Sequence, residues 1–217
     1  MWAWAFLIAV GEGILTTSGT SVASIDCERS LDQVCPFNAT FPDSKQEFAA
    51  FCPRLLTYVR CNQNYGESCR RTEGQSRQNQ RFVDTVRAVC EKGSSLNRAL
   101  GDNARCISST YLNDYVFNCT DASRRLRALY RNFVEYSPYN FRKTMCLNEY
   151  SNVACAKRIF QKECGTAAAQ ASQQVFGLLR LFDQYCASKN VEEFRTVIPQ
   201  LNLTEEVKES LLEVLNL

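Results

Sequence analysis

Apolar residues recur at helical spacing along the second half of this 217-residue chain. The stripe in residues 146–164 consists of Cys146, Tyr150, Val153, Phe160 and Cys164. A second stripe follows in residues 166–186. Gly165 suits the end of the first helix, and Thr166 is a candidate N-cap of the second. The pattern therefore predicts an antiparallel helical hairpin that turns near residue 166.

Other parts of the chain also show helical patterns. Pro53 conflicts with a helix running from Ser44 to Arg60, because a proline inside a helix removes a hydrogen bond and kinks the chain. It suits a first helical turn, so we expect this helix to begin near Cys52. Residues 204–217 predict a final helix that packs against the rest of the protein. Its apolar face consists of Val207, Leu211, Val214 and Leu215.

The twelve cysteines fall into two groups of six with similar spacing. They are Cys27, Cys35, Cys52, Cys61, Cys69 and Cys90, then Cys106, Cys119, Cys146, Cys155, Cys164 and Cys186. The last four of each group are separated by 8, 7 and 20 residues and by 8, 8 and 21 residues. Chance similarity is the alternative, because the first two spacings match poorly. We expect an all-α fold of disulfide-stapled helical hairpins in two tandem six-cysteine repeats.

The N-terminal segment resembles a secretory signal. An apolar run from Trp2 to Val10 is followed by small residues and an A-x-A-like cleavage site after Ala23, without the usual basic n-region. A buried helix is the alternative. No later segment approaches the roughly 18 apolar residues that span a bilayer. The predicted order is a signal peptide at 1–23, a first repeat at 24–92, a connector at 93–105, a second repeat at 106–188 and a helical tail at 189–217.

Hairpin geometry selects two disulfide pairs. Cys146 and Cys186 are equidistant from the turn at residue 166, and Cys52 and Cys90 are equidistant from residue 71. Equal arms of a hairpin bring such ends level with each other. We therefore predict the bridges Cys52–Cys90 and Cys146–Cys186.

The nine-residue spacing of Cys146, Cys155 and Cys164 argues against a metal or catalytic centre. Each step makes two and a half helical turns and rises roughly 13 Å, so neighbouring cysteines point to opposite sides. They cannot converge on one ion. We expect Cys155, with Cys164 as a further candidate, to bond to the earlier part of the repeat, which contains Cys106 and Cys119.

Several features favour export. An even number of well-spread cysteines indicates an oxidising compartment. Asn38, Asn118 and Asn202 each begin an Asn-X-Thr sequon and are candidate glycosylation sites. A sequon alone is a weak signal, and Thr204 has the alternative role of capping a helix. Together with the signal segment, these features predict a secreted, extracellular glycoprotein.

The residue types present limit the available chemistry. The chain contains no histidine, which excludes Ser-His-Asp and Cys-His catalysis and His-ligated zinc. It also lacks a Walker A loop, a G-x-S-x-G motif and a C-x-x-C motif. Carboxylate pairs such as Glu192 and Glu193 are more typical of solvated surface than of a glycosidase site. We expect no enzyme activity, no cofactor and no metal site.

One basic region is a candidate interaction surface. Arg124, Arg127 and Arg131 share one side of the helical segment SRRLRALYRNF. An ordinary amphipathic helix with a basic outer face explains this pattern. The functional alternative is docking to an anionic partner such as a sulfated glycan, an acidic protein surface or lipid headgroups. The net charge of +2 is too small to indicate a nucleic-acid partner.

The tandem C-x8-C-x7/8-C-x20/21-C units behind a signal segment resemble cysteine-rich secreted helical proteins of invertebrates, of the haemolymph, venom and saliva types. The resemblance covers residues 27–186 and rests on cysteine spacing and helicity. It implies an exported, disulfide-rich helical protein and brings no catalytic residues with it.

The function that we expect is secreted, non-enzymatic binding, by a body-fluid component or a venom or saliva effector. The partner would be an extracellular protein or glycan. The alternative is a carrier of small apolar ligands in a cavity between helices. That cavity would be lined by Tyr150, Val153, Phe160, Phe176, Phe182 and Tyr185. Such stripes more often form plain core.

Overall fold

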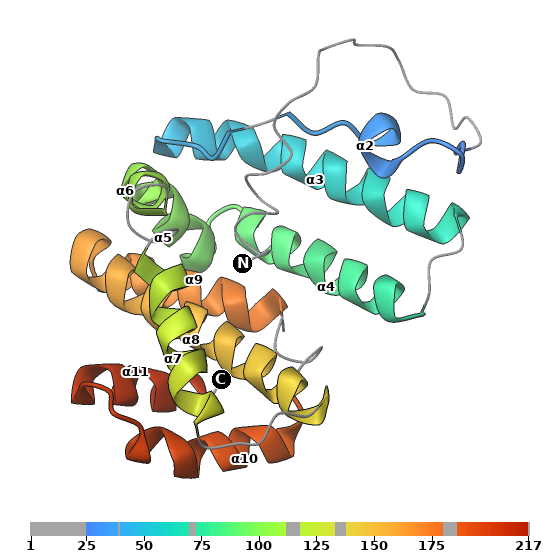
Figure 1. Cartoon of the computed structure of the whole chain (residues 1–217). Helices are drawn as coiled ribbons and strands as arrows, with labels where there is room; N and C mark the ends of the chain where they lie inside the picture. The colour runs from blue at the N-terminus through green and yellow to red at the C-terminus, as the bar shows by residue number, and fades with distance from the viewer. Residues whose placement is uncertain are drawn as a thin grey trace. The chain divides into compact units, whose positions relative to one another are not determined.

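The computed structural model describes residues 25–38, 40–69, 73–111, 118–132, 138–179 and 186–216 (Figure 1). The predicted signal segment lies outside these ranges. Every regular element in them is a helix, which confirms the predicted all-α class. The chain divides into an N-terminal unit that ends at Arg105 and a C-terminal unit that begins at Cys106. Among the helices described, none combines the length and apolar character needed to cross a membrane.

Two long helices form a hairpin in the N-terminal unit. Helix α3 (Lys45–Ser68) packs against α4 (Glu73–Cys90), and the two lie side by side (Figure 1). The short α2 (Leu31–Val34) packs on α3, and α5 (Ser95–Asp102) packs on both helices of the hairpin. The buried core includes Phe48, Phe51, Leu55, Val59, Val83, Val86, Leu96 and Leu100.

Helix α3 begins earlier than the sequence predicts. Ser44 is its N-cap, and Pro53 lies inside the helix, so the start expected near Cys52 is wrong. Phe48 and Phe51, which precede the proline, are only 4% and 5% exposed. Burying such side chains stabilises the fold by roughly 1.5–3 kcal/mol each. This burial offsets the helical hydrogen bond that Pro53 cannot make.

Residues 93–105, expected to form a connector, contribute to the core of the N-terminal unit. The Oγ of Ser94 caps α5 by accepting a hydrogen bond from the backbone nitrogen of Asn97 at 3.0 Å. A Cβ atom at Gly101 would lie 3.2 Å from Cδ1 of Phe48. Glycine therefore allows α5 to lie directly against α3.

The C-terminal unit is built around its longest helix, α8 (Pro138–Cys164). Helices that pack against α8 include α7 (Thr120–Arg131), α9 (Thr166–Leu179), α10 (Ser188–Val197) and α11 (Glu205–Val214). Helix α6 (Ala104–Thr110) begins at the boundary between the units, and the short 3-10 helix η3 (Ile198–Gln200) follows α10. The turn after α8 is at Gly165, with φ +83°, as the sequence predicts. Residues 150–156 of α8 are all buried, because other helices surround it.

The C-terminal helix packs on α8 through the face that the sequence predicts. Leu211 and Val214 are 1% and 0% exposed. The Oγ of Ser210 donates a hydrogen bond to the carbonyl oxygen of Ala154 at 3.2 Å. The segment expected to form a tail is therefore part of the core of the C-terminal unit.

All twelve cysteines are bonded in pairs within their own units. The pairs are Cys27–Cys69, Cys35–Cys61, Cys52–Cys90, Cys106–Cys164, Cys119–Cys155 and Cys146–Cys186. The two bridges predicted from hairpin geometry are both present, with Cα–Cα distances of 5.3 Å for Cys52–Cys90 and 5.1 Å for Cys146–Cys186. Cysteines at equal distances from the turn of a hairpin therefore lie level with each other in both units.

Both units pair their cysteines in the same order. With the cysteines of each unit numbered one to six, the first bonds to the fifth, the second to the fourth and the third to the sixth. Six cysteines allow 15 pairings. A shared pattern therefore agrees with duplication of one module, and the tandem repeat itself stays a prediction.

Candidate functional site

The three arginines predicted as a surface for an anionic partner all lie on α7. Arg124 and Arg131 are exposed, whereas Arg127 is half-buried. Arg124 forms an ion pair with Asp121 at 3.4 Å. The opposite face of the helix is buried through Leu126 and other side chains. We call Arg124, Arg127 and Arg131 the α7 arginine face; its role in binding stays a prediction.

The asparagine side chains of all three sequons are exposed. Asn38 follows α2, Asn118 precedes α7, and Asn202 lies between η3 and α11. Attachment of an oligosaccharide requires an accessible asparagine. The folded protein therefore has room for a sugar at each sequon.

The residues proposed to line an apolar cavity belong to the packed core. Tyr150, Val153, Phe160 and Phe176 are 6%, 2%, 0% and 4% exposed. Phe182 and Tyr185 lie outside the described residues. None of the four described side chains lines the cleft described next.

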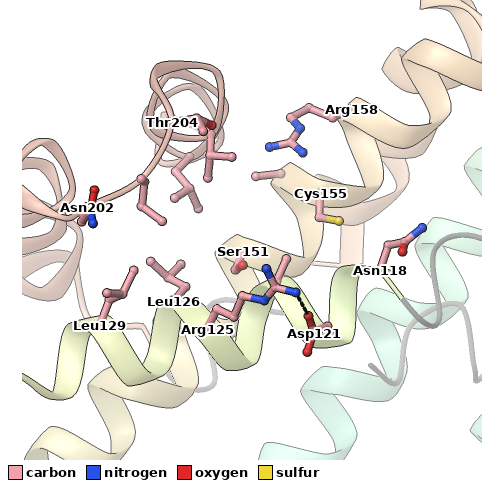
Figure 2. A pocket seen from close by; sticks show the side chains of 15 residues that line it. Asn118, Asp121, Arg125, Leu126, Leu129, Ser151, Cys155, Arg158, Asn202 and Thr204 are labelled. Atoms are coloured by element: carbon pink, nitrogen blue, oxygen red, sulfur yellow. Dashed lines mark hydrogen bonds and ion pairs between the residues drawn. The ribbon is translucent and has the colours of Figure 1, made fainter.

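A cleft of about 410 Å³ opens on the C-terminal unit between α7, α8 and α11 (Figure 2). We call it the α7–α11 cleft. Its lining residues are Asn118, Asp121, Ala122, Arg125, Leu126, Leu129, Ser151, Ala154, Cys155, Arg158, Asn202, Leu203, Thr204, Val207 and Leu211. The cleft therefore combines an apolar floor with a polar rim.

Buried contacts between α7 and α8 position one wall of the cleft. The disulfide Cys119–Cys155 joins the start of α7 to the middle of α8. One turn later, the Oγ of Ser123 donates a hydrogen bond to Oδ1 of Asn152 at 2.6 Å, and both side chains are buried. Together these contacts fix the position of α7 along α8 and the rotation of α7 about its own axis.

A partly buried ion pair also holds this wall in place. Glu193 on α10 accepts a hydrogen bond from the hydroxyl of Tyr130 at 2.7 Å and forms an ion pair with Lys143 of α8. Burial acts to raise the pKa of Glu193. The hydrogen bonds from Lys143 and Tyr130, with the charge of Lys143, outweigh it and lower that pKa. The network ties α7, α8 and α10 together.

Apolar side chains form the floor of the cleft. Leu126 and Leu211 are almost fully buried. Leu129, Leu203 and Val207 remain half-exposed and face the opening from α7, from the loop after η3 and from α11. Covering the exposed apolar atoms of the floor with an occupant is favourable by about 25 cal/mol for each Å² of apolar surface removed from water.

Two arginines stand at the rim, and each has an acidic partner. Arg125 forms an ion pair with Asp121, drawn as a dashed line in Figure 2. Arg158 lies 3.4 Å from Glu206, measured from Nε to Oε1. The Nε atom of Arg158 is nevertheless buried without a hydrogen-bond partner. The rim therefore offers polar groups, and each of its two arginines has a carboxylate beside it.

An acidic and a sulfur-containing side chain of the lining are both engaged in other contacts. Asp121 is the one carboxylate of the lining, and it is engaged by Arg124 and Arg125. Cys155 is held in a disulfide. In the described ranges, no group of three or more acidic or cysteine side chains is arranged to hold a metal ion.

Comparisons with known proteins found no matching family model, no matching curated protein and no matching solved structure.

The cleft residues Arg125 and Arg158 were not singled out from the sequence. Arg125 lies in the same segment as the α7 arginine face, but its position on the helix turns it towards the cleft. Arg158 lies in the stretch CLNEYSNVACAKRIFQKEC, where cysteine spacing is the dominant signal. No motif marks either residue, because the cleft exists only once α11 has packed on α8.

Proposed function

We propose that this protein is a secreted, non-enzymatic, disulfide-rich glycoprotein that acts as an extracellular binding protein or as an effector of the venom or saliva type. The observation that supports export is the pairing of all twelve cysteines within their own units. Disulfides persist in oxidising compartments and are rare in the cytosol. The three exposed sequon asparagines support glycosylation.

The α7 arginine face is the surface that we assign to binding, with an anionic extracellular protein or glycan as partner. Within this face the side chain of Arg124 is 67% exposed, and it shares its acidic partner with Arg125 of the cleft rim. Their shared partner, Asp121, neutralises one of these two charges. Exposed cations on a rigid helix attract an anionic partner over a distance set by the ionic strength, about 8 Å at physiological salt.

Binding to immobilised heparin, as a sulfated glycan probe, tests this assignment. The double substitution Arg124→Glu and Arg131→Glu should weaken retention and reduce its dependence on salt. The double substitution Arg87→Glu and Arg98→Glu in the N-terminal unit is the matched control, because it changes the net charge by the same amount at two exposed arginines, the first of which also forms an i,i+3 ion pair at 3.4 Å. Equal retention of the two variants would remove the α7 arginine face from the proposal.

Expression in eukaryotic cells with a secretory pathway tests export. The protein should appear in the medium with an N-terminus at or near Ser24, with six disulfides and with sugar on at least one sequon. Peptide mapping without reduction measures the bridges, and mass analysis measures the N-terminus and the sugar. Retention in the cytosol with reduced thiols would contradict the proposal. In the source organism, expression confined to a gland would favour the venom or saliva effector, whereas broad expression would favour a body-fluid protein.

A carrier of small apolar ligands is the second candidate function, and the α7–α11 cleft is the observation that favours it. Its volume falls within the usual range for ligand sites, roughly 300–1,000 Å³. Uptake of a fluorescent fatty acid tests the carrier. Leu129→Glu should abolish uptake, whereas Leu178→Glu should not, because Leu178 is an exposed leucine outside the cleft. Failure of the secreted protein without substitutions to take up the probe would eliminate this candidate.

A further inference from the structure

Two of the three sequons open onto one cleft. Asn118 and Asn202 are far apart in the sequence, yet both line the α7–α11 cleft. Figure 2 shows them on opposite sides of it, and both side chains are exposed. Because Asn118 precedes α7 and Asn202 precedes α11, each lies where a wall of the cleft begins. A sugar on either asparagine starts at the edge of the cleft.

The charges around the cleft favour a neutral occupant. Arg125 is paired with Asp121, and Arg158 with Glu206. An anionic ligand would have to compete with these carboxylates for the arginines. A neutral molecule with many hydroxyl groups can accept hydrogen bonds from the same side chains while the ion pairs stay intact.

The floor and rim together match the two kinds of surface on a sugar ring. Half-exposed Leu129 and Val207 offer apolar contact to the C–H face of a pyranose and to the methyl group of an N-acetyl substituent. Thr204 and Arg158 stand above this floor and offer hydrogen bonds to hydroxyl and carbonyl oxygens.

Covalent attachment makes weak contacts sufficient. A sugar tethered at the edge of the cleft has an effective concentration of roughly the millimolar range or above. A free sugar of the same affinity would leave the cleft mostly empty. The tethered sugar therefore occupies the cleft even when its contacts with the floor are individually small.

We propose that the first sugars of the N-linked chains on Asn118 and Asn202 lie in the α7–α11 cleft, where they cover its apolar floor and join the walls formed by α7 and α11. This inference rests on the glycosylation that the proposed function includes. It adds a structural role for these sugars. It also excludes apolar ligands from the cleft in the glycosylated protein.

Hydrogen exchange on the secreted, glycosylated protein tests the proposal. Thr204→Val removes the sequon at Asn202 with little change in side-chain shape, and Thr204→Ser is the matched control that keeps the sequon. Thr204 occupies the N-cap of α11 but makes no side-chain capping hydrogen bond, so the substitution removes no such bond. We expect amide exchange in α7 and α11 to become faster by roughly five- to tenfold in Thr204→Val and to stay unchanged in Thr204→Ser.

Two further measurements protect the test against a misfolded variant. Enzymatic removal of the sugars from the folded protein without substitutions should accelerate amide exchange in α7 and α11 by the same factor. It should also admit a fluorescent apolar probe that the glycosylated protein excludes. Asn38→Gln is a control for sugar loss in general, because Asn38 belongs to the other unit, and it should leave exchange in α7 and α11 unchanged.

The outcomes separate this inference from the proposed function. Mass analysis that finds sugar on Asn118 or Asn202, combined with unchanged exchange after its removal, would overturn the inference alone. A secreted protein that carries sugar at neither Asn118 nor Asn202 would overturn the inference, and the glycoprotein proposal would then depend on Asn38.

Discussion

Lys143 on α8 forms an ion pair with Glu193 on α10, and the two side chains are 11% and 31% exposed. Tyr130 on α7 donates a hydrogen bond to the same carboxylate. Three helices of the C-terminal unit therefore meet at one partly buried charge pair. The pair connects the wall of the α7–α11 cleft to a segment that follows the last cysteine.

Removing the cation should destabilise the C-terminal unit. Lys143→Met leaves the Glu193 carboxylate without its counter-charge, and we expect the free energy of unfolding to fall by about 1–3 kcal/mol. The effect should stay below that of a fully buried pair, because Glu193 retains contact with water. Denaturant titration with the disulfides intact measures it. Lys162→Met is the control on the same helix, since Lys162 is 83% exposed and pairs with its neighbour Glu163. Equal effects of both substitutions would contradict the prediction.

The same pair predicts a dependence of stability on pH. The pKa of Glu193 is lowered on folding from its ordinary value of 4.5. A lowered carboxyl pKa contributes stability that is present above the ordinary pKa and is lost as the pH falls through the lowered one. Glu193→Gln should therefore be less stable near neutral pH and lose less stability below about pH 4.5. Thermal unfolding across this range measures the difference, and parallel profiles for the two proteins would count against it.

Each disulfide should stabilise its own unit. The bridges Cys52–Cys90 and Cys146–Cys186 close loops of similar length, with sequence separations of 38 and 40. The chain-entropy relation gives about 4 kcal/mol for either one. Replacing both cysteines of one bridge by alanine should lower the stability of that unit and leave hydrogen exchange in the other unit unchanged. Equal loss of protection in both units would show that they do not fold separately.

Pro53 is a position where a substitution should increase stability. It is exposed inside α3, and an alanine there would supply the backbone N–H that can bond to the carbonyl of Ala49. We expect Pro53→Ala to raise the free energy of unfolding by about 1 kcal/mol. The restored helical hydrogen bond adds stability, and the greater conformational freedom of the unfolded chain removes part of this added stability. Pro199→Ala is the control, since Pro199 lies in the first turn of η3, where the N–H is dispensable. Thermal unfolding measures both, and a lower midpoint for Pro53→Ala would disprove the prediction.

The structure differs from what the sequence predicts where local and tertiary effects compete. Local backbone chemistry places a helix start at Pro53, and the burial of Phe48 and Phe51 extends the helix through it to Lys45. The aromatic and aliphatic stripe of α8 and α9 allows either a cavity or a core, and close packing makes it a core. Helical periodicity alone does not distinguish these alternatives, because it records which face is apolar and not what covers it.

The amino-acid sequence by itself determined the helical class, the two groups of six cysteines and the partners of two bridges. These features depend on periodicity and on distances along a hairpin, which are local properties of the chain. Only the tertiary structure decided how the remaining cysteines pair and how α11 returns to α8. It also brought Arg125, Arg158, Asn118 and Asn202 to one cleft. Residues so distant in sequence meet because apolar faces of separate helices are buried together, and no local pattern records which faces will meet.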